Sequence, residues 1–200
     1  MLACKRCIFD DILLSIDSVY HNILEHIKSY PIAKSKQSRS IIGPVPQSGY
    51  PLGFFYGVVN STSGGAGIVL SINNLHYFHI KLGCGTSTNT RAKLLALWTL
   101  LTFVKTLGLP TLHAYGDSQV IINWANSKAG LSDLDLEHWC IHISDIKKYF
   151  LSLSFQHVFR EHNKSVDSLS KEALLLKVGS LSFMEFYEGT KTGEGTTQLF

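Results

Sequence analysis

The order in which the apolar pattern changes its period between residues 52 and 176 constrains the fold more than any other feature of the sequence. Three short strand-like runs come first, at 53–59, 66–72 and 76–82, with turn-forming residues between them. After them, helices are expected at 90–107, 117–126, 134–150 and 163–176, and strands at 111–115 and 153–159. This region therefore begins as a run of strands and continues as a mixture of helices and strands.

This order predicts an α/β fold built on one mixed sheet. Three strands joined by short turns form an antiparallel meander, whereas the later strands follow helices, and such crossovers make strands parallel. Helices that connect parallel strands cover the faces of the sheet. We therefore predict a five-stranded mixed sheet, with three antiparallel strands followed by two parallel strands and with helices on both faces.

Outside this compact region the sequence predicts three further segments. Apolar residues recur at three- and four-residue steps within 1–30, which is typical of one amphipathic helix with a single apolar stripe. The stretch 31–51 is basic and then rich in Pro, so we expect a linker. The compact domain occupies 52–176. Residues 177–200 form a C-terminal extension whose Gly- and Thr-rich tail is expected to be disordered.

Composition and cysteine use favour an intracellular protein that makes no contact with a membrane. The 200 residues carry a formal net charge of +3, and 45% of them are hydrophobic. No apolar run approaches the roughly 20 residues that a membrane-spanning helix needs, and the N-terminus lacks the order of a signal peptide. The four cysteines are scattered without the spacing of a disulfide framework, so we expect them to be reduced.

The charges are distributed very unevenly along the chain. Between Glu25 and Asp117 there is no Asp or Glu, whereas the same stretch contains eight Lys and Arg residues. A surface of one sign can attract phosphate groups. The alternative is an ordinary solvated surface, and charge alone favours that alternative.

Short motifs stand at the expected ends of the strands and helices between Leu52 and Leu176. They are Phe55-Tyr56-Gly57, Gly64-Gly65-Ala66-Gly67-Ile68, Thr88-Asn89-Thr90-Arg91-Ala92-Lys93-Leu94, Tyr115-Gly116-Asp117-Ser118-Gln119, and Arg160-Glu161-His162-Asn163 with Asp167. Each motif alone is weak, but their order is specific. This region resembles the ribonuclease H type-1-like domains of plant-type non-LTR retrotransposons, which are linked to reverse transcriptase.

The resemblance implies Mg²⁺-dependent hydrolysis of the RNA strand in an RNA–DNA hybrid. In that chemistry, four carboxylates hold two Mg²⁺ ions about 3.5–4 Å apart, one to activate water and one to stabilise the leaving oxygen. By position, the two retained metal ligands are Asp117 and Asp167. The bridging Asp of the family is replaced by Tyr56, and its helix Glu is replaced by Lys93.

The two replacements predict impaired catalysis. A phenol is neutral at pH 7 and brings no charge to offset two divalent cations, so Tyr56 is expected to be a partly buried strand aromatic. Lys93 places an ammonium group where a cation should bind. We expect Lys93 at the third position of a helix capped by Thr90, where Glu would complete a capping box. Asp117 and Asp167 also have simpler interpretations, as a helix N-cap and as a residue that favours the helix dipole.

A domain that has lost hydrolysis can still keep the surface that binds the substrate. The resemblance places Asn89, Thr90 and Gln119 against the minor groove of the hybrid, and Arg160 and His162 beside the last helix. Such hybrids are recognised by shape and by 2′-hydroxyl contacts. A solvated loop residue is the simpler interpretation of His162. The implied partners are an RNA–DNA hybrid and a reverse transcriptase domain.

A zinc finger at the N-terminus is a rival interpretation. Cys4, Cys7, His21 and His26 have the spacing C-x2-C-x13-H-x4-H. A finger needs a hairpin around its cysteines, whereas helical periodicity begins at Ile8, so an amphipathic helix is favoured over zinc.

Three functions remain open from the sequence. The first is a ribonuclease H-like domain of retroelement origin with lost or strongly reduced hydrolysis. The second is a module that binds the hybrid without cutting it. The third is a structural connector without any nucleic-acid role.

Overall fold

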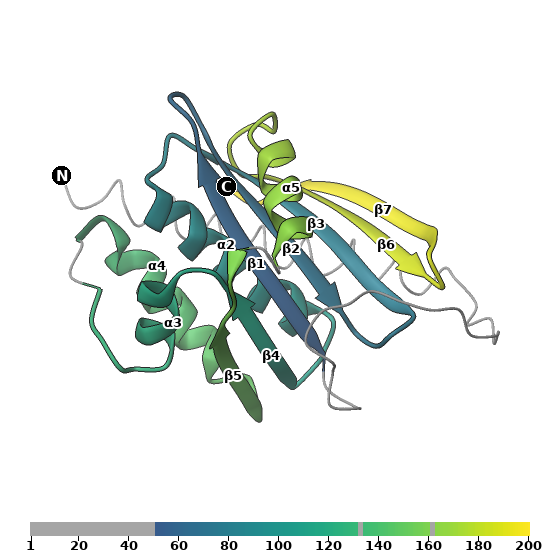
Figure 1. The fold of residues 1–200 in the computed structure, drawn as a ribbon, viewed down its shortest axis with the longest axis horizontal. Coiled ribbons are helices and arrows are strands. Elements are labelled where there is room, and N and C mark those ends of the chain that lie inside the picture. The colour runs from purple at the N-terminus through teal and green to yellow at the C-terminus, as the bar shows by residue number, and fades with distance from the viewer. Residues whose placement is uncertain (1–50, 132–133, 161–162) are drawn as a thin grey trace.

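The computed structural model describes residues 51–131, 134–160 and 163–200. The predicted helix at 1–30 and almost all of the linker at 31–51 lie outside the described residues, as does the rival zinc site. Within the described residues, seven strands form one sheet in the order β5-β4-β1-β2-β3-β6-β7 (Figure 1). No helix of these parts of the chain is long and apolar enough to cross a membrane.

The first three strands form the predicted antiparallel meander. They are β1 Leu52–Val59, β2 Gly64–Ser71 and β3 His76–Gly85. Asn60 fixes the first turn, because its side-chain oxygen accepts hydrogen bonds from the backbone N–H groups of Thr62 (2.9 Å) and Ser63 (2.7 Å). Asn favours a turn at this position because its side-chain oxygen takes the place of a backbone hydrogen-bond acceptor.

The rest of the domain supplies the parallel half of the sheet. Strand β4 Thr111–Gly116 pairs parallel with β1, and β5 Ser152–His157 pairs parallel with β4. The helices are α2 Asn89–Thr106, α3 Gln119–Ala125, α4 Leu134–Lys147 and α5 Lys164–Ala173. The predicted fold class is therefore confirmed, with each expected element within a few residues of its predicted bounds.

Two glycines bring helices onto opposite faces of the sheet. A Cβ atom at Gly57 of β1 would collide with the backbone of α2 at Ala92 and Lys93. A Cβ atom at Gly67 of β2 would collide with the backbone of α5 at Val166 and Ser170. Because neither glycine carries a side chain, the two helices approach the strands closely, one on each face. Figure 1 shows α2 and α5 on either side of the β1–β2 pair.

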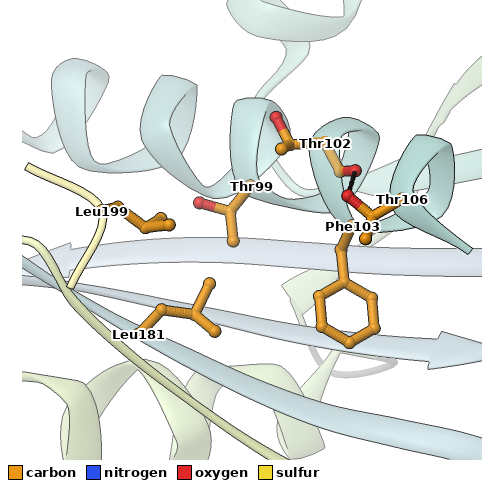
Figure 2. A pocket seen from close by; sticks show the side chains of 6 residues that line it. All are labelled: Thr99, Thr102, Phe103, Thr106, Leu181 and Leu199. Atoms are coloured by element: carbon orange, nitrogen blue, oxygen red, sulfur yellow. Dashed lines mark hydrogen bonds between the residues drawn. The ribbon is translucent and has the colours of Figure 1, made fainter. Parts of the chain in front are cut away.

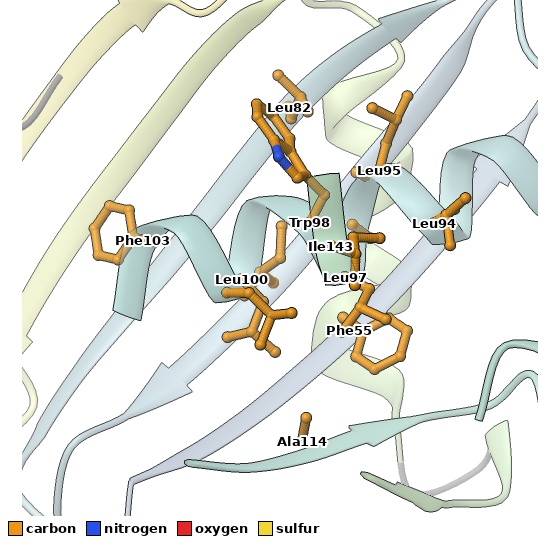
Figure 3. Packing of buried hydrophobic residues seen from close by; sticks show 14 of the residues in the cluster. Phe55, Leu82, Leu94, Leu95, Leu97, Trp98, Leu100, Phe103, Ala114 and Ile143 are labelled. Atoms are coloured by element: carbon orange, nitrogen blue, oxygen red, sulfur yellow. The ribbon is translucent and has the colours of Figure 1, made fainter. Parts of the chain in front are cut away.

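The main core lies between the sheet and α2. Figure 3 shows Phe55 of β1 and Leu82 of β3 directed toward the apolar side chains of α2. Trp98 is 1% exposed and meets Trp139 of α4 edge to face, with ring centroids 5.1 Å apart. The sheet covers one side of α2 and α4 covers another, which explains why this helix is apolar almost all round.

The C-terminal tail is ordered, so the expectation of disorder at its end is wrong. Residues Ser180–Tyr187 form β6 and Thr190–Gln198 form β7, which extends the sheet from the expected five strands to seven. Strand β6 pairs antiparallel with β3, and its alternating Leu181 and Phe183 are buried. The two turn residues, Glu188 and Gly189, both have positive φ, as a tight hairpin requires.

The hairpin adds to the same core rather than forming a separate unit. Phe183 lies edge to face against Phe103 of α2 with ring centroids 5.7 Å apart, and Gly195 of β7 leaves room for the Phe183 ring. Figure 2 shows the side chains that line a small pocket between α2 and the C-terminal segment. It is lined by Thr99, Thr102, Phe103, Thr106, Leu181 and Leu199.

The starts of two helices differ from the sequence prediction. The cap of α2 is Thr88, whose hydroxyl accepts a hydrogen bond from the N–H of Arg91 (3.2 Å), so the expected cap at Thr90 is wrong. Lys93 is consequently in the second turn, beyond the reach of a capping box. The cap of α3 is Ser118, so Asp117 precedes that helix and does not cap it. The simpler interpretation of Asp117 is therefore excluded.

Candidate functional site

Four side chains from four different elements meet at one end of the β1–β4 pair. Tyr56 belongs to β1, Lys93 to α2 and Asp167 to the first turn of α5, while Asp117 directly follows β4. These are the four positions that the sequence aligned with metal ligands. The structure brings all four together. Lys93 contacts both Asp117 and Tyr56, and Arg160 contacts both Tyr56 and Asp167.

Lys93 and Asp117 form an ion pair inside this site. The Lys93 Nζ lies 3.0 Å from the Asp117 Oδ1, and the two side chains are only 19% and 11% exposed. An ion pair shielded from water is screened less than one on the surface. The ammonium group of Lys93 therefore already satisfies one of the two carboxylates in this site.

Asp167 is satisfied in the same way, by two cations. Its Oδ1 accepts a hydrogen bond from the Arg160 guanidinium at 2.9 Å, and its Oδ2 accepts one from the Lys171 Nζ at 2.6 Å. Burial alone would raise the pKa of Asp167, but the hydrogen bonds from Lys171 and Arg160 outweigh burial and hold its pKa below the usual value. Asp167 is therefore an anion at neutral pH with both oxygens occupied.

Tyr56 lies between the two charged pairs. The Lys93 Nζ is 5.1 Å from the centre of the Tyr56 ring, and the Arg160 guanidinium carbon is 5.3 Å from it, so both cations contact the aromatic face. Burial, followed by the negative charge of Asp117, raises the pKa of Tyr56 above its usual value. The phenol thus stays neutral near pH 7 and serves as a surface for cations.

Asn163 fixes the start of α5 against β1. It is 2% exposed, and its side-chain amide donates a hydrogen bond to the backbone oxygen of Phe55 at 3.3 Å. Phe55 precedes Tyr56 in the chain, so this contact sets the distance between Tyr56 and the first turn of α5. Together with the close approach at Gly67, it places Asp167 and Arg160 beside the Tyr56 ring.

The residues present do not fit a pair of Mg²⁺ ions. Mg²⁺ prefers carboxylate oxygens in octahedral geometry, and this site offers two carboxylates, each already bound to a cation of the protein. Across the described ranges, no group of three or more His, Cys, Asp or Glu residues could hold a metal ion. A divalent ion entering the site would compete with Lys93 for Asp117 and with Arg160 and Lys171 for Asp167.

The residues expected to contact nucleic acid are mostly exposed around this site. Asn89 and Gln119 are exposed at the first residues of α2 and α3, and Thr90 is half-buried beside Asn89. Gln119 also donates a hydrogen bond to the Asn123 side chain (2.8 Å). Arg160 is 61% exposed. His162 lies outside the described residues, and the binding role of all five remains a prediction.

Sequence reasoning missed Lys171 and the placement of Asn163. Lys171 follows Asp167 by four residues, a spacing that puts two side chains on the same face of a helix. That signal was present in the sequence and could have predicted the pair. The contact of Asn163 with Phe55 spans 108 residues and carries no local signal.

Comparison with known proteins places the compact domain among ribonuclease H folds. The sequence matches the family described as reverse transcriptase-like over residues 54–173. Ribonuclease H1 from the halophilic archaeon Halobacterium salinarum NRC-1 is similar, with 24% identity and a TM-score of 0.55, over 63% of this chain and 98% of that chain. No curated protein matches the sequence.

Two other solved structures are similar at the level of the fold. The N-terminal ribonuclease H domain of a Mycobacterium tuberculosis protein has 19% identity and a TM-score of 0.57, over 62% of this chain and 92% of that chain. LC11-RNase H1, from a compost metagenome, was solved in complex with an RNA/DNA hybrid. It has 23% identity and a TM-score of 0.56, over 62% of this chain and 96% of that chain.

The family match and the fold agree. The match covers more than half of the chain and runs from within β1 to the end of α5, whereas β6 and β7 lie outside it. The solved structures share the same architecture at low identity and support the fold alone. The chain therefore belongs to the reverse transcriptase-like family, and its compact domain has the ribonuclease H fold.

Proposed function

We propose that this domain binds RNA–DNA hybrids and has lost, or strongly reduced, the ability to hydrolyse their RNA strand. The observation that carries the proposal is the 3.0 Å ion pair between Lys93 and Asp117. It puts a fixed cation of the protein on the carboxylate that hydrolysis by this family would need for a metal ion. The second carboxylate, Asp167, is held by Arg160 and Lys171 in the same way.

Binding is supported by a separate set of features. A structurally similar protein, LC11-RNase H1, forms a complex with an RNA/DNA hybrid, and the polar residues Asn89 and Gln119 are exposed at helix starts on this chain. Recognition of such hybrids depends on shape and on 2′-hydroxyl contacts, neither of which needs a catalytic metal. Binding can therefore persist after the carboxylates are lost.

The decisive experiment measures binding and cleavage side by side. A fluorescent RNA–DNA hybrid and a DNA duplex of the same sequence are titrated with the wild-type chain, and the hybrid is then incubated with Mg²⁺. We expect preferential binding of the hybrid and no cleavage above that of Asp117→Asn. Cleavage by the wild type that Asp117→Asn abolishes would show an active enzyme. Equal, negligible affinity for both duplexes would favour the structural connector.

The double substitution Tyr56→Asp with Lys93→Glu tests whether the loss lies in these two positions. It supplies two carboxylates on rigid elements and removes the cation from Asp117, so we expect measurable Mg²⁺ binding by calorimetry and some cleavage. Arg160 and Lys171 would still hold Asp167, so the recovery should be partial. The single substitutions should recover less than the pair, and equal, negligible binding in all variants would show that the whole pocket has changed.

We further propose a retroelement origin and a reverse transcriptase domain as the protein partner. The description of the matching family supports this proposal. Co-expression with a reverse transcriptase domain of this type of element, followed by size-exclusion chromatography, tests it. Separate elution of the two proteins would contradict it.

A further inference from the structure

The site carries more positive than negative charge without any metal ion. Three cationic side chains, Lys93, Arg160 and Lys171, contact two carboxylates, Asp117 and Asp167. Tyr56 adds no charge, because burial raises the pKa of its phenol. These contacts leave one positive charge in excess at the place where the family brings metal ions to a phosphate.

The excess charge lies on the solvent side of the site. Arg160 and Lys171 share the single carboxylate of Asp167, and their side chains are 61% and 57% exposed, whereas Asp167 is 17% exposed. Lys93, by contrast, is enclosed with Asp117. The two outer cations therefore face any ligand that approaches the site.

Both outer cations have hydrogen-bond donors to spare. A guanidinium has five N–H donors and an ammonium has three, while the described contacts to Asp167 use one donor of each. The Tyr56 ring, 5.3 Å from the Arg160 guanidinium, supports this side chain on one face. A guanidinium fixed in this way suits paired hydrogen bonds to two oxygens of a phosphate.

We propose that Arg160 and Lys171 hold a backbone phosphate of the bound nucleic acid directly, without a metal ion. The inference rests on the proposed binding of hybrids and adds the chemistry of the contact. Direct pairing with a phosphate releases condensed counterions, so the contact contributes affinity that falls as salt rises. The former catalytic site thus serves as a metal-independent anchor for the substrate.

The experiment measures hybrid affinity in EDTA and in Mg²⁺ at matched ionic strength, over a series of salt concentrations. The wild type should bind equally in both. Arg160→Gln and Lys171→Gln should each weaken binding about five- to tenfold near 0.1 M salt and reduce the slope of log affinity against log salt by about one. Arg160→Lys, which keeps the charge, should recover part of the loss.

Lys191→Gln is the matched control. Lys191 is also a half-exposed lysine in an ion pair, with Glu194 at 2.6 Å, but it lies on β7 at the far edge of the sheet. Its substitution should leave both the affinity and the salt slope unchanged. Circular dichroism and thermal unfolding of each variant would exclude loss of the fold as the cause.

Three results would overturn the inference, and each has a different consequence. Affinity that rises with Mg²⁺ at constant ionic strength would assign the contact to a metal ion. If binding is independent of metal and is unchanged by Arg160→Gln and Lys171→Gln, the phosphate is bound elsewhere, and the proposed binding of hybrids still stands. No binding by the wild type in any condition would remove the proposed function as well.

Discussion

Helices α2 and α5 lie on opposite faces of one sheet, yet they are held there in different ways. In α2, thirteen of eighteen residues are buried, and the helix is enclosed by the sheet and by α4. In α5, four of ten residues are buried, and the helix rests on the backbone of β2 at Gly65 and Gly67. Both helices approach a strand closely at a glycine, but α2 in addition buries most of its side chains, whereas α5 buries few.

This difference explains how the two halves of the functional site behave. The half on the α2 side is the enclosed pair of Lys93 with Asp117. The half on the α5 side is Asp167, which is itself mostly buried, held by the exposed cations Arg160 and Lys171. The charge of Lys93, on the tightly packed helix α2, is used in an enclosed ion pair. The charges of Arg160 and Lys171, beside and on the less buried helix α5, remain accessible to ligands.

The largest expected effect is on the α2 side, where Trp98→Ala should lower the free energy of unfolding by about 3–5 kcal/mol. Trp98 is 1% exposed and packs against Trp139 of α4, so its removal leaves a cavity. Urea unfolding at neutral pH measures the loss. Val120→Ala, at a 58% exposed position, should change stability by less than about 0.5 kcal/mol. Equal effects of the two substitutions would mean that packing on α2 does not dominate.

An intermediate effect is expected on the α5 side, where Gly67→Ala should cost about 1–3 kcal/mol. The added methyl group collides with backbone atoms of Val166 and Ser170, which have no rotamer to change. Displacement of α5 should also weaken hybrid binding, because Asp167 and Arg160 would move. Gly130→Ala is the control, since nothing lies within 4 Å of a Cβ atom there. An unchanged unfolding midpoint for Gly67→Ala would disprove the close approach.

The smallest effects are expected in the pH dependence of stability, which distinguishes the α2 and α4 side of the sheet from the α5 side. Burial, then the neighbouring His142 and Arg91, lowers the pKa of His138 on α4 to about 4 from 6.5. Between pH 6.5 and 4, His138 is therefore protonated in the unfolded chain but neutral in the folded chain. The free energy of unfolding falls as the pH drops through this range. Asp167 has a pKa below its usual 3.8, so its contribution persists above pH 3.8 and is lost as the pH falls below that value.

Two variants assign these pH ranges. In urea unfolding over a pH series, His138→Gln should reduce the loss between pH 6.5 and 4, and Asp167→Asn should reduce the loss below pH 3.8. Because burial also lowers the pKa of His79 and of His142, part of the upper slope should remain in His138→Gln. An unchanged profile in either variant would contradict the assignment of that range to that residue.

The sequence by itself determined the central architecture. The switch from short strand-like runs to helical periodicity located β1 to β5 and α2 to α5 within a few residues. Gly57 and Gly67 belonged to the quoted motifs, but only the structure shows that α2 and α5 approach the strands closely there. The motifs around Asp117 and Asp167 identified where the site would form, because strand ends and helix starts are fixed by local signals.

Tertiary structure decided the contacts that are distant in sequence. The hairpin of β6 and β7 was missed because its β7 sequence is polar and rich in Gly and Thr, and because its pairing with β3 and the packing of Phe183 against α2 are distant in sequence. The α2 cap moved from Thr90 to Thr88 because either threonine can accept the capping hydrogen bond. Local pattern does not choose between such equivalent residues.

The charge state of the site is the clearest case of this division. The resemblance implied that Tyr56 and Lys93 stand at two acidic positions of the family, but not that Lys93 would bind Asp117 or that Arg160 would lie over the Tyr56 ring. Those contacts join residues 24 and 104 positions apart, and folding alone brings them within a few ångströms. The sequence specifies which charged residues are present. Which of them pair depends on the side chains that the sheet, α2 and α5 bring to the same end of the β1–β4 pair.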